Sequence, residues 1–182
     1  MSAMNQVSSI NKFMTLMNIL WYGGVAFFLL FVPTLFLIVL FTNQLNIEYH
    51  GITMTVENVS SHFLALLPII GLALTIMGVI LGIIFLFRQV VKNVQKGDVF
   101  IFKNVIHMRT IAGLFFIISI LSTLLNFGVS LFLTTHVETI DKILSPTFDI
   151  SYGLLFGSIM IFLIAEVFKY GIEIETDSKL SI

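Results

Sequence analysis

The stretch RQVVKNVQKGDVFIFKNVIHMR, residues 88–109, decides how the rest of the chain is interpreted. It holds five of the nine Lys and Arg residues and a Gly97-Asp98 turn signal, and a long apolar run lies on each side of it. Loops that join membrane spans on the cytoplasmic side carry an excess of Lys and Arg. We therefore interpret residues 88–109, named the connector below, as a cytoplasmic loop between two membrane-spanning segments.

The composition of the whole chain predicts that its solvent is largely lipid. Of 182 residues, 58% are hydrophobic and 10% are charged, and the mean hydropathy is +1.06. Soluble domains carry roughly 25% charged residues, and a chain of this length keeps much of its surface wet, so it cannot bury so much apolar surface. The formal net charge of −1 gives no sign of direct nucleic-acid binding, and the absence of cysteine excludes disulfides and thiolate chemistry.

Four apolar runs are long enough to cross a bilayer, which takes about 20 helical residues. They cover residues 18–41, 62–87, 105–133 and 150–168. Since a helix satisfies its own backbone hydrogen bonds in lipid, we expect an all-α membrane protein, with residues 1–182 forming a single integral membrane domain. The expected architecture is a four-transmembrane-helix bundle. Alternating apolar and polar residues around Gly51 are a weak signal of a small hairpin in the first outer loop, which is either a plain solvated connector or a small lid or ligand-facing loop.

Glycine pairs predict close helix contacts. Gly78 and Gly82, and again Gly153 and Gly157, are spaced four residues apart, which lets two helices approach closely in lipid. We expect both pairs to pack inside the bundle of one chain, with homodimerisation through one of them as the alternative.

A polar stripe in the third run has two interpretations. Its members recur on one helical face: Ser119, Ser122, Asn126 and Ser130. The stripe could line a water-filled path, as in a small transporter or pore, or it could form interhelical hydrogen bonds. It contains no charged residue, whereas transport paths usually include one.

No motif predicts chemistry. The sequence contains no P-loop, HExxH, GxSxG or Rossmann fingerprint, so we expect no enzymatic activity, no catalytic residue and no cofactor. The histidines lack the close spacing of metal ligands, and we predict no metal site. They are His50, His62, His107 and His136.

Charged residues near the inner ends of the helices predict a contact between the connector and the C-terminal tail. Glu166 falls at the same expected depth as Arg88 and Arg109, and pairing with either arginine would neutralise charges that are costly at the membrane boundary. Such a pair is either a structural clasp or a switch in which a partner replaces one side. Asp98 is the expected cap of the helix that follows Gly97.

Two cytoplasmic stretches resemble a known family. In KGDVFIFKNVIHMRTIAG, the spacing of Gly97, Phe100, Asn104 and Arg109 resembles the central signature of the DUF2975 family of small bacterial four-span membrane proteins. The segment IAEVFKYGIEIETDSKLSI resembles the closing segment of that family, with matches at Ala165, Glu166, Phe168, Gly171, Glu173 and Asp177. His107 with Met108 departs from a pattern that is more often basic and leucine-rich.

The resemblance implies a location and a partner. It implies a multi-pass protein of the bacterial cytoplasmic (inner) membrane, in a family whose function is not established and whose members are often encoded beside a small helix-turn-helix regulator of the Xre type. A regulatory or sensory partner of such a regulator is therefore one expectation. The alternatives are a small transporter or an accessory subunit of a membrane complex. The candidate partner-binding or clasp residues are Arg88, Gly97, Phe100, Asn104, Arg109, Glu166 and Gly171.

The distribution of Lys and Arg predicts the orientation. Lys12 precedes the first run, and Lys169 and Lys179 follow the fourth, whereas Lys142 alone lies in a loop on the other side. Both termini should therefore be cytoplasmic. A reporter that is active only in the cytoplasm, fused after Ser181, should be active, and the matching periplasmic reporter should be silent. Activity of the periplasmic reporter alone would overturn the orientation.

Overall fold

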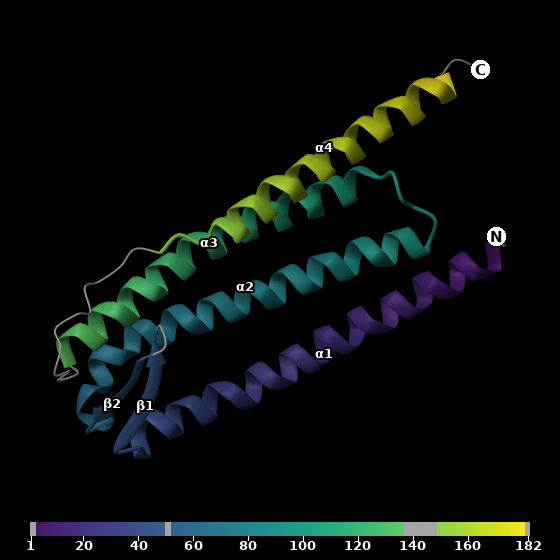
Figure 1. The fold of residues 1–182 in the computed structure, drawn as a ribbon. Coiled ribbons are helices and arrows are strands. Elements are labelled where there is room, and N and C mark those ends of the chain that lie inside the picture. The colour runs from purple at the N-terminus through teal and green to yellow at the C-terminus, as the bar shows by residue number, and fades with distance from the viewer. Residues whose placement is uncertain (1–2, 50–51, 137–148, 181–182) are drawn as a thin grey trace. The chain divides into compact units, whose positions relative to one another are not determined.

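The computed structural model describes residues 3–49, 52–136 and 149–180, and within them the helices follow the apolar runs of the sequence (Figure 1). The elements are α1 (Ala3–Phe41), β1 (Gln44–Tyr49), β2 (Ile52–Glu57), the short 3-10 helix η1 (Val59–His62), α2 (Phe63–Gln95), α3 (Phe102–His136) and α4 (Tyr152–Leu180). Four helices in the described part are long and apolar enough to cross a membrane. The prediction of an all-α membrane protein with four spanning helices is confirmed.

The helices extend beyond the apolar runs that predicted them. α1 begins well before residue 18, α2 continues past residue 87 to Gln95, and α4 continues past residue 168 to Leu180. Apolar length reports the thickness of the hydrocarbon layer, whereas a helix continues into water as long as its polar residues support it. In α4 this extension holds an ion pair one turn apart, between Lys169 Nζ and Glu173 Oε1 at 3.6 Å.

The hairpin predicted around Gly51 forms. β1 and β2 pair antiparallel, with Gln44 opposite Glu57 and Tyr49 opposite Ile52. Asn58 then adopts a left-handed conformation, with φ of 52°, which asparagine tolerates better than most residues, and its carbonyl accepts a hydrogen bond from Ser61 Oγ at 2.6 Å. The chain thereby turns from β2 into η1 and α2.

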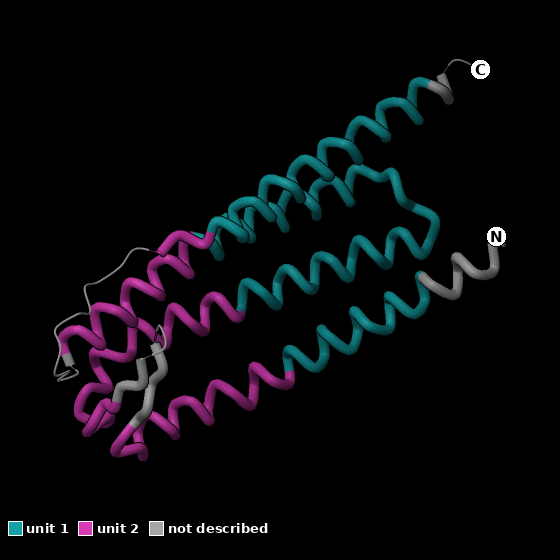
Figure 2. The backbone as a smooth tube through the Cα atoms, viewed as in Figure 1, with its two compact units in different colours: residues 1–25, 78–119, 152–182 teal, residues 26–77, 120–151 magenta. Residues whose placement is uncertain are grey.

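The chain divides into two compact units (Figure 2). The second unit covers residues 26–77 and 120–151 and includes the hairpin. Its described core is apolar and comprises Val39, Val56, Val59, Ile70, Phe132 and Leu133. The hairpin contributes to this core through Val56, which is 1% exposed.

The first unit covers residues 1–25, 78–119 and 152–182, and it contains the connector. Here α1 and α2 run antiparallel, and their contacts step along both helices: Leu81 lies against Gly24, Phe85 against Trp21 with ring centroids 5.2 Å apart, and Arg88 against Asn18. A Cβ on Gly24 would lie 2.8 Å from Leu81 Cδ2, so a larger residue at this position would require the Leu81 side chain to shift. Elsewhere in this unit, Val90, Met108 and Ala165 form a small buried cluster of α2, α3 and α4 residues.

The glycine pairs each place one glycine in a contact. A Cβ on Gly82 would meet Leu114, and one on Gly157 would meet Phe115, at 3.9 and 3.8 Å. Around Gly78 and Gly153 no atom lies within 4 Å of the added Cβ. One glycine of each pair therefore lies at a contact between helices of the same chain, and the alternative of homodimerisation through either pair stays untested.

Large apolar side chains cover the outside of both units. Leu30, Phe41, Leu64 and Val167 are each more than two thirds exposed, and they belong to three different helices. In water such a surface would promote aggregation, whereas in a bilayer it contacts lipid tails that are equally apolar. The chain is thus a multi-pass membrane protein whose outer surface contacts lipid.

Candidate functional site: the connector and the tail

Within the connector, α2 ends at Gln95 and a tight turn follows at Gly97. The Gly97 N–H donates to Val94 O and the Asp98 N–H donates to Asn93 O, both at 3.0 Å, and Gly97 has a φ of +88°. This is the Schellman arrangement, in which a glycine in the left-handed region lets the chain turn back over the last helical carbonyls. Gly97 therefore has a defined role, because a side chain at this φ would be strained.

The amide of Asn104 holds the loop that follows. Asn104 is 0% exposed. Its Nδ2 donates to Asp98 O at 3.0 Å and to Val99 O at 2.9 Å, and its Oδ1 accepts from Asn93 Nδ2 at 2.6 Å. One side chain thus satisfies two loop carbonyls and joins α3 to the end of α2.

This arrangement corrects the expected role of Asp98. α3 begins at Phe102, too far along the chain for Asp98 to cap it. The backbone carbonyl of Asp98 accepts the Asn104 amide instead, and the Asp98 residue is exposed. A cap was expected because Asp follows Gly97, but the chain needs several extended residues to travel from α2 to α3.

Phe100 links this loop to α4. Its ring lies 5.8 Å from the Phe168 ring, centroid to centroid, and it also covers Gly171. A Cβ on Gly171 would lie 2.8 Å from Phe100 Cε1, so the ring occupies the space that a side chain there would need. The ring thus packs on the tail on one side, while Phe100 remains 48% exposed.

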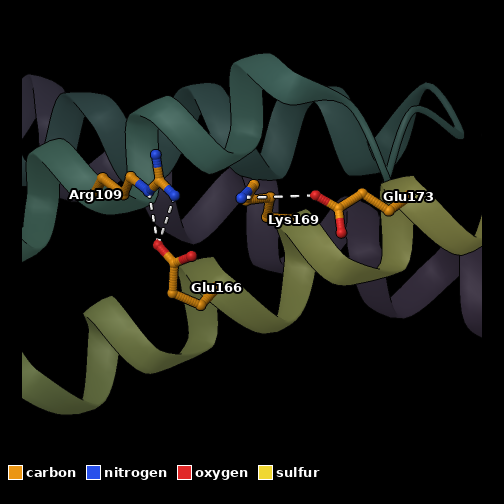
Figure 3. Close-up of polar contacts among 4 residues, drawn as sticks. All are labelled: Arg109, Glu166, Lys169 and Glu173. Carbon is orange, nitrogen blue, oxygen red and sulfur yellow. Dashed lines mark hydrogen bonds and ion pairs between the residues drawn. The ribbon is translucent and has the colours of Figure 1, made fainter.

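Glu166 pairs with Arg109 (Figure 3). Arg109 Nη2 lies 2.6 Å from Glu166 Oε1, and Nε donates to the same oxygen at 2.9 Å. The two side chains are 38% and 37% exposed, so the pair is only partly buried within the protein. Of the two arginines considered from the sequence, Arg109 therefore contacts the tail.

Arg88 has different partners, which the sequence reasoning missed. Its Nε donates to Asn18 Oδ1 at 2.6 Å, and its Cζ lies 5.6 Å from the centroid of the Tyr22 ring. Asn18 and Tyr22 are one turn apart in α1, a spacing that places them on one face. That spacing was visible in the sequence, but nothing there indicated which helix faced it.

We name residues 96–109 and 165–177 the connector–tail surface, because Phe100 and the Arg109–Glu166 pair join these two segments. Its connector part exposes Lys96 and Lys103, for which the described residues provide no carboxylate partner. Its tail part exposes Glu173, Glu175 and Asp177. The surface thus presents a positive patch and a negative patch from two different segments.

Other polar residues do not form one site. Within the polar stripe, Ser119 and Ser130 are buried, Ser122 is half-buried and Asn126 is exposed, so the four do not share one environment. Ser158 Oγ donates to Ala112 O at 2.8 Å, an interhelical bond that the stripe did not predict. His107, the departure from the family pattern, has a buried Nε2 that accepts or donates no hydrogen bond among the described residues. In that same part of the chain, no three His, Asp or Glu residues come together as metal ligands.

Comparison with known proteins gives one result. A family model described as "Protein of unknown function (DUF2975)" matches residues 58–182, from the residue before η1 to the end of the chain. The match includes the connector and the tail. No curated protein and no solved structure matches the chain.

Replacing Asn104 by Ala should destabilise the chain by about 3 kcal/mol, because three hydrogen bonds of about 1 kcal/mol each are lost. Asn93→Ala removes one of the three and should cost about 1 kcal/mol. Unfolding followed by circular dichroism in detergent micelles measures both values. Equal losses for the two variants would contradict the central role of Asn104.

A double-mutant cycle of Arg109→Gln and Glu166→Gln should give a coupling energy of about 0.5–1 kcal/mol, since the pair is more than a third exposed. The exposed Lys169–Glu173 pair provides a matched control, with about 0.3–0.5 kcal/mol expected for a pair one helical turn apart. A coupling below the control value would show that the Arg109–Glu166 contact does not hold the tail.

Proposed function

Because the chain belongs to the DUF2975 family, a family of unknown function, its role must be inferred from its own residues, and we propose that its connector–tail surface binds a small soluble protein. In this proposal the chain lies in a bacterial cytoplasmic membrane with both termini and the connector in the cytoplasm. The excess of Lys and Arg in the connector supports that orientation. The bound protein is a small helix-turn-helix regulator, the partner that the family resemblance implies.

The observation that carries the proposal is that two segments far apart in sequence build one surface. Asn104 fixes the loop at the end of α2, and Phe100 places that loop on α4. Such a surface is rigid enough to recognise a partner, because its backbone is held by buried hydrogen bonds and not by the partner itself.

The charges of this surface support a polar partner. Lys96 and Lys103 are exposed on the connector, and Glu175 and Asp177 are exposed on the tail. Complementary charges at the rim of an interface steer association and fix its register. A partner that carries an acidic patch and a basic patch in the matching order would satisfy both halves.

The Arg109–Glu166 pair allows the connector–tail surface to change when a partner binds. Both side chains are more than a third exposed, so a charged group of a partner can reach and replace either one. Binding would then loosen the tail from α3. In this way the exposure of the pair favours an exchangeable contact over a permanent clasp.

A pull-down with the neighbouring helix-turn-helix regulator tests the proposal. The full chain in mild detergent should retain the regulator, and the connector variant Lys96→Gln/Lys103→Gln should retain about fivefold less, which corresponds to about 1 kcal/mol for two rim charges. The tail variant Glu175→Gln/Asp177→Asn should show a similar loss.

The control is Glu57→Gln, which removes a charge from the hairpin and should leave recovery unchanged. Circular dichroism confirms that each variant is folded. Absent recovery with every chain, or equal recovery with the wild type and both surface variants, would overturn the proposal.

A further inference from the structure

The two arginines at the membrane boundary are neutralised differently. Arg109 pairs with the carboxylate of Glu166, whereas the described partners of Arg88 are the neutral amide of Asn18 and the neutral ring of Tyr22. No described carboxylate pairs with Arg88. A charge near the hydrocarbon layer is costly without a counter-charge. Arg88 therefore needs an anion that the described chain does not supply.

The helices around Arg88 cannot provide one. Neither α1 nor α2 contains an Asp or Glu within its bounds, and the charged residues of the two helices are Lys12, Arg88 and Lys92. Lys92 lies one turn beyond Arg88 in α2 and is exposed. Near the ends of the same two helices, Gln95 Nε2 donates to Asn11 Oδ1 at 2.7 Å, which is again a neutral contact. The α1–α2 seam is thus uniformly positive.

The structure leaves the two terminal guanidinium nitrogens of Arg88 available to a ligand. Its Nε donates to Asn18, and no described residue accepts from the two terminal nitrogens, which carry four of the five N–H donors of a guanidinium. These donors form a planar fork that matches the oxygens of a phosphate. The side chain of Tyr22 beside it is 61% exposed, so this part of the seam opens to the surroundings.

The residues around Arg88 are of the types that gather at the depth of lipid headgroups. Trp21 and Tyr22 lie beside the Phe85–Arg88 turn of α2, and amphipathic aromatic residues gather where a membrane meets water. The anion present in quantity at that depth is the phosphate of a phospholipid. Because Lys92 adds a second positive charge, a lipid with net negative charge is favoured over a zwitterionic one.

We propose that Arg88, held by Asn18 and Tyr22, binds the phosphate of an anionic phospholipid at the seam between α1 and α2. Asn18 positions the guanidinium through Nε, Tyr22 covers one of its faces, and the terminal nitrogens bind the phosphate oxygens. The site is separate from the connector–tail surface and does not depend on a protein partner.

Native mass spectrometry of the full chain released from nanodiscs tests the proposal. In nanodiscs of equal parts phosphatidylglycerol and phosphatidylcholine, the wild-type chain should retain one phosphatidylglycerol in preference to phosphatidylcholine. Arg88→Gln should lower that retention about tenfold, the loss expected for charge-assisted hydrogen bonds to a phosphate. Arg88→Lys keeps the charge but loses the fork, and it should retain an intermediate amount.

Two controls separate the outcomes. Lys103→Gln removes an exposed connector charge and should leave lipid retention unchanged. Inorganic phosphate at millimolar concentration should not displace the lipid, and displacement would assign the site to free phosphate and overturn the lipid proposal. The preference of the wild-type chain for phosphatidylglycerol over phosphatidylcholine is measured without any variant. If that preference is absent, the proposal is overturned even if Arg88→Gln fails to fold. A folded Arg88→Gln chain with unchanged retention would show that Arg88 only joins α1 to α2, and would overturn it as well.

Discussion

The hydrogen bonds of the Asn104 side chain are the interaction on which the first unit depends. Between α2 and α3 the chain leaves helical structure, and its carbonyls lose their helical donors at a point close to the membrane boundary. The amide of Asn104 supplies donors to two of those carbonyls and receives a third bond from Asn93. With the loop held in this way, Phe100 lies over Gly171 and Arg109 faces Glu166. The contact between connector and tail therefore follows from a buried polar group.

The parts of the fold that follow from local pattern could be predicted. The four spanning helices were predictable because apolar length has no other economical explanation in a chain of this size, and the hairpin followed from alternation around Gly51. Helix ends were predicted poorly, because the polar ends of α1 and α4 continue as helix beyond the apolar residues. Asp98 was assigned as a cap from its place after Gly97, but the preference of Asn104 for the loop carbonyls decides where α3 begins.

The site residues likewise divide into those that could be selected from the sequence and those that could not. Gly97 could be selected from sequence because a Gly-Asp turn between apolar runs is recognisable, whereas Phe100 and Gly171 were selected through the family resemblance. The choice of Arg109 over Arg88 as the partner of Glu166 could not, since both arginines fall at the same expected depth and the rotation of each helix about its axis decides which one faces α4. Asn18 and Tyr22 were missed for a related reason: the pairing of α1 with α2 is tertiary, and neither residue is unusual by itself. The positive charges predict which side of the membrane the connector occupies, and that orientation stays a prediction.

The turn at Gly97 also limits how this chain can change in length. The segment from Gly97 to Asn104 is anchored at both ends. Gly97 closes α2 through its bond to Val94, and Asn104 bonds to the carbonyls of residues 98 and 99. An added or deleted residue in the loop between them would change the distance that the loop spans, so Asn104 would lose its bond to at least one of the two carbonyls or α3 would have to shift. A shift of α3 would also disturb the contact of Arg109 with Glu166. The length of the segment 97–104 is therefore constrained, and we expect insertions and deletions to be tolerated better in other loops.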